Sequence, residues 1–499
     1  MDSNKKPVKQ KMKTILPVST VAIMNITAVV SLRGLPAEAE YGVSSAFFYL
    51  LAAVVFLIPT ALVAAELAAM FSDKEGGVFR WVGEALGKKL GFVAIWLQWV
   101  ECAIWFPTGL TFCAVSIAFI GLDHATDLQL ATNKMYTLAV VLATYWLSSF
   151  IAMKGLHKVG KISKIGGLAG TVIPAALLIL FGIIYLATGG KPQMDLQGGF
   201  FPDLTKLDNL VLASGIFLFY AGMEMGGVHV TNMNNPGKNY PKAVLIGSAA
   251  AVIIFISGTY ALGLIIPEKQ INLIHSLLVG FDNYLSYLHL SWLSPVIALA
   301  LAFGVLAEVL TWVSGPSRGL LSVGRAGFLP PYFVKLNKNG VQKNILLVQG
   351  YIVTLLCLLF VIMPSVQSFY QILSQLTILL YLVMYLLMFA SVIILRYSMK
   401  NAPRPFRIGK KGNLLIWLVA GMGFAASLFA FGLSFVPPSQ ISTGNNIVWY
   451  SILIGGCVLF IALPFVIYAF RKPSWQTSGT LEPFHWEKTT TASEDKNPI

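Results

Sequence analysis

The fold is decided by residues 219–227, Phe219-Tyr-Ala-Gly222-Met-Glu224-Met-Gly-Gly227, which place a carboxylate and three glycines inside the apolar run 209–230. A matching interruption lies in the first apolar run, where residues 30–36 read Val-Ser31-Leu-Arg33-Gly34-Leu-Pro. Glycine weakens a helix, and a charge inside a bilayer costs about 2.5–3.5 kcal/mol on insertion scales. Non-helical backbone survives at that depth only where it faces protein or a water-filled cavity. The two stretches therefore predict two broken membrane helices beside a polar centre.

The rest of the chain has the composition of a membrane protein. Only 11% of the 499 residues are charged and 56% are hydrophobic, whereas a soluble domain carries about 25% charged residues. A spanning helix needs about 20 mainly apolar residues. Runs of that kind lie at about 15–36, 46–71, 91–121, 135–153, 166–188, 209–230, 243–266, 291–315, 345–363, 370–396, 413–436 and 448–470. We predict an all-α membrane protein of about 12 transmembrane helices, with one transporter domain over 15–470.

The basic residues predict the orientation of these spans. If residues 1–14 are cytoplasmic, thirty Lys and Arg residues fall in cytoplasmic segments and four fall outside, while Arg33 lies within the first span. Positive residues gather on the cytoplasmic side of membrane proteins, so both 1–14 and the tail 471–499 are expected in the cytoplasm. The formal net charge of +14 has this origin, and we expect the lipid bilayer as a partner and no nucleic acid.

The two interrupted spans are the first and the sixth, five spans apart, so they cross the membrane in opposite directions. Paired broken helices at matching positions are typical of inverted repeats, with a binding site at the repeat interface. Ordinary glycine packing positions are the alternative interpretation of the same residues.

Several motifs resemble those of the amino acid–polyamine–organocation superfamily, and some are similar to its glutamate/γ-aminobutyrate antiporter family. The superfamily motifs are Glu75-Gly-Gly-Val-Phe-Arg-Trp81, Gly315-Pro-Ser-Arg318, Gly327-Phe-Leu-Pro-Pro331 and Pro403-Arg-Pro-Phe-Arg407. The antiporter motifs are Gly222-Met-Glu224, His229-Val-Thr-Asn-Met-Asn-Asn-Pro236, Gly304-Val-Leu-Ala-Glu308 with Trp312, Lys335-Leu-Asn-Lys-Asn-Gly-Val341 and Thr477-Ser-Gly-Thr-Leu-Glu-Pro483. Together they cover nearly the whole chain.

The resemblance implies a five-plus-five inverted repeat with broken helices 1 and 6, followed by two further spans. It also implies exchange of an external amino acid, first glutamate, for its decarboxylation product, γ-aminobutyrate, in support of acid resistance. The protein would lie in a bacterial cytoplasmic (inner) membrane, with a functional link to a cytoplasmic decarboxylase. Span one departs from the aromatic-rich segment of the enterobacterial exchangers. An exchanger of tyrosine and tyramine or of another such pair, and a proton symporter, therefore remain open.

The broken helices supply the expected substrate site. Free N–H groups and carbonyls at the breaks can bind the carboxylate and the ammonium of an amino acid. The candidate positions run from Ser31 through Arg33 to Gly34, and from Phe219 and Tyr220 to Gly222. The Arg33 guanidinium either contacts a substrate carboxylate in bidentate fashion or forms a structural pair with Glu224 or Glu101, or it lies in the outer vestibule.

Three further residues take roles from the resemblance. Glu224 matches a carboxylate at the break of span six, where a proton-linked role competes with that of a fixed partner for Arg33. Glu308 and Trp312 are four residues apart and share one helix face. Trp312 matches a gating aromatic, whose alternative is plain packing, and Glu308 is expected to contact substrate or sense pH.

The remaining candidates have weaker signals. An outer gate is expected among Phe217, Phe219 and Tyr220, because Leu218 stands where related arginine exchangers carry a Trp, although most such aromatics are core. Glu66, Glu101 and His229 are interpreted mainly as structural. The tail 471–499 is either a passive end or a cytoplasmic plug with pH-sensitive contacts near His485.

The sequence offers no sign of catalysis. The four cysteines lie in apolar runs without metal-ligand spacing, and no nucleophile cluster, nucleotide loop or filter repeat is present. We therefore expect no metal, no cofactor and no enzyme activity, and neither a channel nor a membrane enzyme.

Overall fold

The computed structural model describes residues 17–121, 123–196, 198–206, 209–211, 214–358, 360, 363, 365–409, 412–437, 445–476 and 482–487. Within these ranges the chain is helical and contains no strand, and it has eleven helical segments long and apolar enough to cross a membrane. The predicted all-α membrane fold is confirmed.

The spans follow the order of the sequence runs, several of them built from two consecutive helices. The helices of the first half are α1 (Val18–Val29), α2 (Leu35–Ala39), α3 (Ser45–Ala52), α4 (Ile58–Met70), α5 (Val78–Leu86), α6 (Lys88–Ala118), α7 (His124–Thr132), α8 (Lys134–Ala152), α9 (Leu156–Gly167) and α10 (Ile173–Ala187). Those of the second half are α12 (Gly215–Tyr220), α13 (Pro236–Ile265), α14 (Ser276–Tyr287), α15 (Ser294–Arg325), α16 (Lys343–Cys357), α18 (Val366–Ser398), α19 (Leu414–Leu433) and α20 (Asn446–Ala469).

The predicted ninth span, 345–363, coincides with α16, an apolar helix of only 15 residues. Residues 359, 361 and 362 of that span lie outside the described residues. The other eleven predicted runs each contain a segment of spanning length. Several segments are longer than predicted, and the two largest extensions are α9, a basic helix before the fifth predicted run, and the part of α15 that continues past Pro316 to Arg325.

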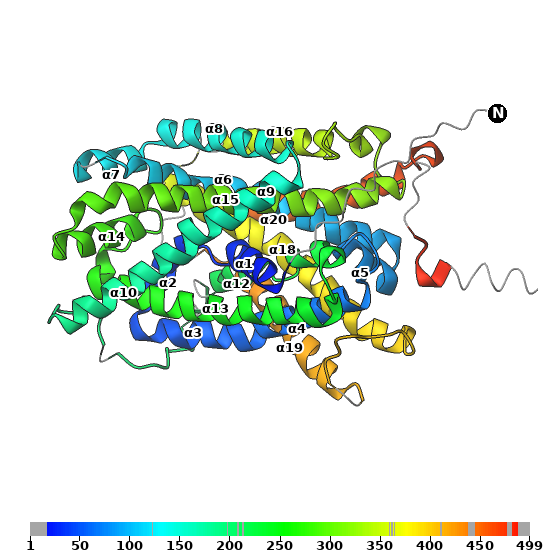
Figure 1. Ribbon diagram of the computed structural model, residues 1–499, viewed down its shortest axis with the longest axis horizontal. Coiled ribbons are helices and arrows are strands. Elements are labelled where there is room, and N and C mark those ends of the chain that lie inside the picture. The colour runs from blue at the N-terminus through cyan, green and yellow to red at the C-terminus, as the bar shows by residue number, and fades with distance from the viewer. Residues whose placement is uncertain are drawn as a thin grey trace, which may run out of the picture.

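The bundle is organised around α6. Nearly all of its side chains are buried, and it packs chiefly against α15 and α18. Figure 1 shows α1 and α12 near the middle of the bundle, α5 at one end, and α7 and α14 at the other. We call these ends the α5 end and the α14 end.

Both predicted breaks are present. In span one, α1 stops at Val29, Val30 and Ser31 are extended, and a 3₁₀ turn over Leu32–Gly34 leads into α2. In span six, α12 stops at Tyr220, and Ala221 is extended. Gly222 has a φ of 114°, a conformation that L side chains rarely adopt. Residues 225–232 then form a 3₁₀ helix.

Candidate functional site

A small buried cavity lies between the two breaks. Its volume is about 20 Å³, and it brings together five of the predicted site residues. These are Ser31, Arg33, Phe219, Glu308 and Trp312. A cavity of this size holds about one water molecule, so an amino acid needs the surrounding side chains to move before it can enter.

Ser31 joins a guanidinium and a carboxyl group at the wall of this cavity. Its Oγ donates a hydrogen bond to Glu308 Oε2 over 3.2 Å, and it accepts one from Arg33 Nε over 3.1 Å. Arg33 Nη1 also donates to the Tyr370 hydroxyl, 3.0 Å away. The guanidinium lies 5.1 Å from the centre of the Trp105 ring. A cationic group and a carboxyl group therefore face one small space, an arrangement that complements a zwitterion.

Glu224 has partners other than Arg33. It accepts hydrogen bonds from Tyr381 over 2.5 Å, Tyr385 over 2.6 Å and Gln98 over 2.9 Å. Among the described residues, no ion pair joins Arg33 to Glu224 or to Glu101, and the carboxyl group that Arg33 approaches through Ser31 is that of Glu308. Glu224 is only 1% exposed and lies outside the cavity wall, behind the break of span six.

The Tyr385 hydroxyl completes this network. It accepts a hydrogen bond from the Gly222 N–H over 2.8 Å while it donates to Glu224. One hydroxyl thus satisfies a backbone group that the broken helix leaves without an intrahelical partner, and it ties the break to α18.

Two aromatic rings close against the glycines of the two breaks. The Phe219 ring lies over Gly34, where an added Cβ would come within 2.7 Å of it. The Trp312 ring lies over Gly222, where an added Cβ would come within 2.9 Å. The Trp312 indole also donates to the Ala28 carbonyl over 3.1 Å. Phe219 of span six thus contacts the break of span one, and Trp312 of span eight contacts both the break of span six and the end of α1.

The other predicted residues separate into groups. Glu101 and Leu218 line the cavity, whereas Tyr220 packs against Tyr49 and Phe255 outside it. Phe217 packs against Phe56. The side chain of His229 lies outside the described residues.

Glu66 has the structural role expected for it. Arg396 donates two hydrogen bonds to its carboxylate, over 2.7 and 2.6 Å, and the Ile408 N–H donates a third over 2.8 Å. Both members of the ion pair are almost fully buried. The pair holds α4, α18 and the loop after α18 together.

Sequence reasoning found Phe219 and Trp312 but missed four other aromatic residues at or beside the site. Trp105 and Tyr381 line the cavity, and Tyr370 and Tyr385 bind Arg33 and Glu224. The spacing of Tyr381 and Tyr385 on one face of α18 was an available signal, but nothing in the sequence indicated which span that face meets.

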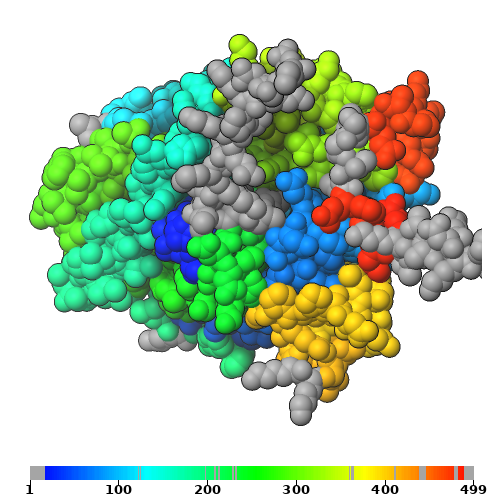
Figure 2. Space-filling view, turned by 45° about the vertical axis from the view of Figure 1, so that its right-hand side comes forward, coloured from blue at the N-terminus to red at the C-terminus, as the bar shows by residue number. Residues whose placement is uncertain are grey.

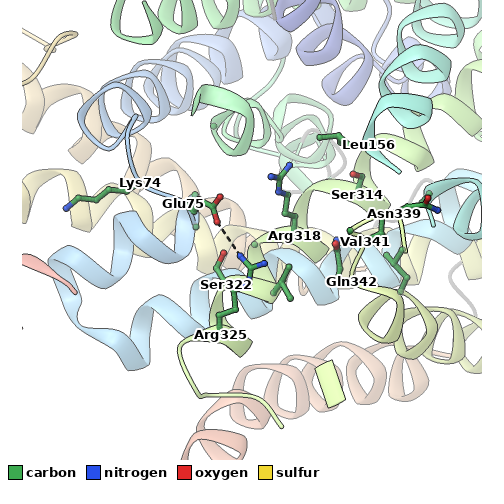
Figure 3. Close-up of a pocket in the computed structure, with 18 residues that line it drawn as sticks. Lys74, Glu75, Leu156, Ser314, Arg318, Ser322, Arg325, Asn339, Val341 and Gln342 are labelled. Atoms are coloured by element: carbon green, nitrogen blue, oxygen red, sulfur yellow. Dashed lines mark ion pairs between the residues drawn. The ribbon is translucent and has the colours of Figure 1, made fainter. Parts of the chain in front are cut away.

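A much larger cavity opens at the α5 end (Figure 3), with a volume of about 310 Å³. Its wall carries Lys74, Glu75, Arg318 and Arg325, so positive charge exceeds negative charge there. Glu75 and Arg325 point toward each other at 3.5 Å. Gly227 and Ser314 line its inner part, so it begins close to the residues that follow the span-six break and Trp312. We call it the vestibule.

Residues 482–487 of the tail lie on α5 (Figure 2). Arg80 donates to the carbonyls of Glu482 and Pro483, and the Trp486 indole donates to the Gly83 carbonyl. The backbone N–H and ring Nδ1 of His485 both contact Glu84 Oε2, at 2.8 and 2.7 Å. No described tail residue lines the vestibule.

The charge of Glu84 is stabilised by these contacts. Burial by itself would raise the pKa of Glu84, but the hydrogen bonds from His485 and the charges of Arg80 and Lys74 outweigh it. The pKa of Glu84 is therefore lowered from its ordinary value of 4.5.

Taken together, two broken helices, a buried polar cavity between them and an aromatic ring on either side define a multi-pass membrane transporter. No group of acidic, His or Cys side chains able to hold a metal ion occurs in the described part of the chain. The sequence profile of the amino acid permease family matches residues 16–461. The chain belongs to this family, whose members carry solutes across membranes.

Several related transporters support this placement. A glutamate/γ-aminobutyrate antiporter of Lactococcus lactis subsp. lactis is 32% identical over 458 residues, which cover 91% of this chain and 88% of that protein. An uncharacterized transporter of Legionella pneumophila is 35% identical over 454 residues, covering 91% of this chain and 96% of the relative. A probable agmatine/putrescine antiporter of Lactococcus lactis is 24% identical over 406 residues, covering 80% and 84%.

Proposed function

We propose that the protein exchanges an external amino acid for its decarboxylation product, with glutamate and γ-aminobutyrate as the first pair. The observation that carries this proposal is the Arg33–Ser31–Glu308 chain at the break of span one, with contacts of 3.1 and 3.2 Å. The guanidinium suits the carboxylate common to both substrates, and the carboxyl group of Glu308 suits their ammonium group. The relatives named for such exchange support the same assignment.

The physiological role follows from the chemistry of the pair. Decarboxylation consumes a proton in the cytoplasm, so import of the acid and export of the amine product removes protons from the cell. The protein would then work beside a cytoplasmic decarboxylase in the inner membrane of a bacterium and support acid resistance. Another decarboxylase pair, or a proton symport of one amino acid, is the competing assignment, because residues 30–36 depart from the aromatic-rich segment of the enterobacterial glutamate exchangers.

The positions of the rings and cavities suggest a route. With both termini in the cytoplasm, the α5 end faces inward, and the vestibule is the cytoplasmic approach to the site. Trp312 then closes the site toward the vestibule, and Phe219 closes it toward the outside. Glu224 and Glu308 are the candidates for proton-linked steps, since each is a buried carboxyl group held by neutral hydroxyl donors.

The tail has a defined place in this scheme. Residues 482–487 are hydrogen-bonded to α5, the helix that directly follows the vestibule residues Lys74 to Gly77. A tail held there restrains α5 rather than filling the described vestibule. We therefore assign residues 471–499 an inhibitory role exerted through α5.

Counterflow in proteoliposomes tests the proposed exchange. Vesicles loaded with unlabelled γ-aminobutyrate should accumulate labelled external glutamate, whereas vesicles loaded with buffer should not. A panel of unlabelled amino acids and amines in the lumen then ranks the substrates. Uptake into vesicles without internal substrate, driven by a proton gradient, would replace the antiporter with a symporter. Accumulation driven only by a different pair would keep the antiporter and change its substrates.

A further inference from the structure

A second buried cavity lies on the other side of Phe219, toward the α14 end. Its volume is about 30 Å³. Arg33, Leu218 and Phe219 line both this cavity and the central one. The additional wall includes Glu38 from α2 and Ser374 and Gln375 from α18. We call it the outer cavity, and the Phe219 ring separates it from the central site.

The outer cavity contains hydrogen-bond acceptors without donors. Glu38 is fully buried, at 0% exposure, and neither of its carboxyl oxygens has a hydrogen-bond partner among the described residues. The side-chain oxygen of Gln375 and the hydroxyl of Ser374 are likewise without partners there. A buried polar group without a partner costs about 1–3 kcal/mol, and an unpaired carboxylate costs more. Three such groups on one wall indicate a place built to receive donors.

The charges of the walls identify the donor. The carboxyl group of Glu38 and the Gln375 oxygen are acceptors that match a primary ammonium group, which has three N–H donors. The Arg33 guanidinium on the shared wall matches a carboxylate. The pair Arg33 and Glu38 therefore complements the two ends of an amino acid.

The size of the cavity agrees with this occupant. About 30 Å³ accommodates a group of the size of a water molecule, as an ammonium group is. The rest of an amino acid fits only when the Phe219 ring moves away from Gly34. Leu273 and Tyr370, packed with Ala37 and Tyr41, cover the opposite side.

We propose that the outer cavity is a waiting site for the ammonium group of the incoming amino acid or amine, with Glu38 as its acceptor and Arg33 holding the carboxylate. This rests on the proposed function and its orientation, in which the α14 end faces outward. The substrate first binds with its amine on Glu38. It then passes the Phe219 ring to the central cavity, where Arg33 is already on the wall.

Transport kinetics measured separately from each side of the membrane test this site. The Glu38→Gln variant keeps the shape of the side chain but loses the charge, and Ser374→Ala removes a single hydroxyl. Glu268→Gln is the matched control, because it removes an exposed carboxylate between α13 and α14, at the same end of the bundle, without lining the cavity. Right-side-out and inside-out membrane vesicles report the KM on each face. External n-butylamine and butyrate serve as competitors that carry only one end of γ-aminobutyrate.

Glu38→Gln should raise the external KM about tenfold, the effect of one charge-assisted hydrogen bond, and leave the internal KM within about twofold. It should also abolish inhibition by butylamine but not by butyrate. Ser374→Ala should shift the external KM in the same direction by a smaller factor, and Glu268→Gln should behave as the wild type. Equal changes of KM on both faces, or unchanged butylamine inhibition in both cavity variants, would overturn the proposal. If the wild type exchanges a pair other than glutamate and γ-aminobutyrate, the same comparison is made with that pair. The proposed substrate pair and the proposed outer binding site can therefore be refuted independently.

Discussion

Removing the Tyr385 hydroxyl should impair exchange far more than removing the Tyr381 hydroxyl, although both bind Glu224. Tyr385→Phe deprives two buried groups of their partners, the Gly222 N–H at 2.8 Å and Glu224 Oε2 at 2.6 Å. Tyr381→Phe removes a donor to Glu224 Oε1, and that oxygen keeps Gln98 at 2.9 Å. The two variants are therefore a matched pair.

The expected magnitudes follow from these contacts. Each buried group that loses its partner costs about 1–3 kcal/mol, so Tyr385→Phe should cost about 2–6 kcal/mol in all. Tyr381→Phe replaces one of two donors and should cost about 1 kcal/mol. Since about 1.4 kcal/mol is a factor of ten, initial counterflow rates should fall more than tenfold for Tyr385→Phe and a few-fold for Tyr381→Phe.

The assay compares initial rates at equal protein density in proteoliposomes, with thermal unfolding in detergent as a check on the fold. Tyr385→Phe should lower both the rate and the unfolding temperature more than Tyr381→Phe does. Equal losses in the two variants, or a greater loss for Tyr381→Phe, would refute the view that one hydroxyl holds the span-six break.

Three more outcomes are expected. Gly222→Ala puts a Cβ 2.9 Å from the Trp312 ring at a φ of 114°, a strain of about 1–3 kcal/mol, and should lower the counterflow rate at least tenfold. The control Gly455→Ala adds a Cβ in open space on α20 and should leave the rate unchanged. Normal exchange by both variants would show that transport does not need the break at Gly222. Single cysteines at positions 191 and 338 of a cysteine-free variant should differ in their labelling by an impermeant thiol reagent. Reagent added outside cells should label only the cysteine at 191. The reverse pattern would invert the proposed topology. Because the pKa of Glu84 is lowered below 4.5, its contribution to tail docking persists above that value and is lost as the pH falls through the lowered pKa. Glu84→Gln and a truncation before Ser474 should therefore both raise the transport rate at pH 7. Rates at pH 7 equal to that of the wild type would argue against a restraint through α5.

Much of the fold was predictable because a bilayer requires apolar runs of spanning length and favours positively charged residues in the cytoplasmic loops. The breaks were predictable from Arg33, Gly34 and Gly222, since charge and glycine at membrane depth have few structural explanations. The ninth span was the weakest point, because the hydropathy of 345–363 does not show that α16 ends at Cys357.

The partners within the site could not be predicted in the same way. In a membrane helix, lipid-facing and core-facing sides are both apolar, so periodicity does not reveal that Tyr370 meets Arg33 across 337 positions of sequence. The hydrogen bond of His485 to Glu84 could not be predicted from the sequence either. It depends on how the tail packs on α5, a short amphipathic helix, and no local sequence pattern encodes that contact.

The native Cys102 tests the central claim most directly, because its side chain lines the central cavity while Cys113, Cys357 and Cys457 are buried elsewhere. The rate at which a small membrane-permeant thiol reagent modifies each cysteine can be followed by mass spectrometry of the purified wild type in liposomes. A transported amino acid should slow the modification of Cys102 severalfold and leave the other three unchanged, and an amino acid that is not transported should have no effect. Modification of Cys102 at the same rate with and without saturating substrate, in protein that performs counterflow, would place the substrate site elsewhere.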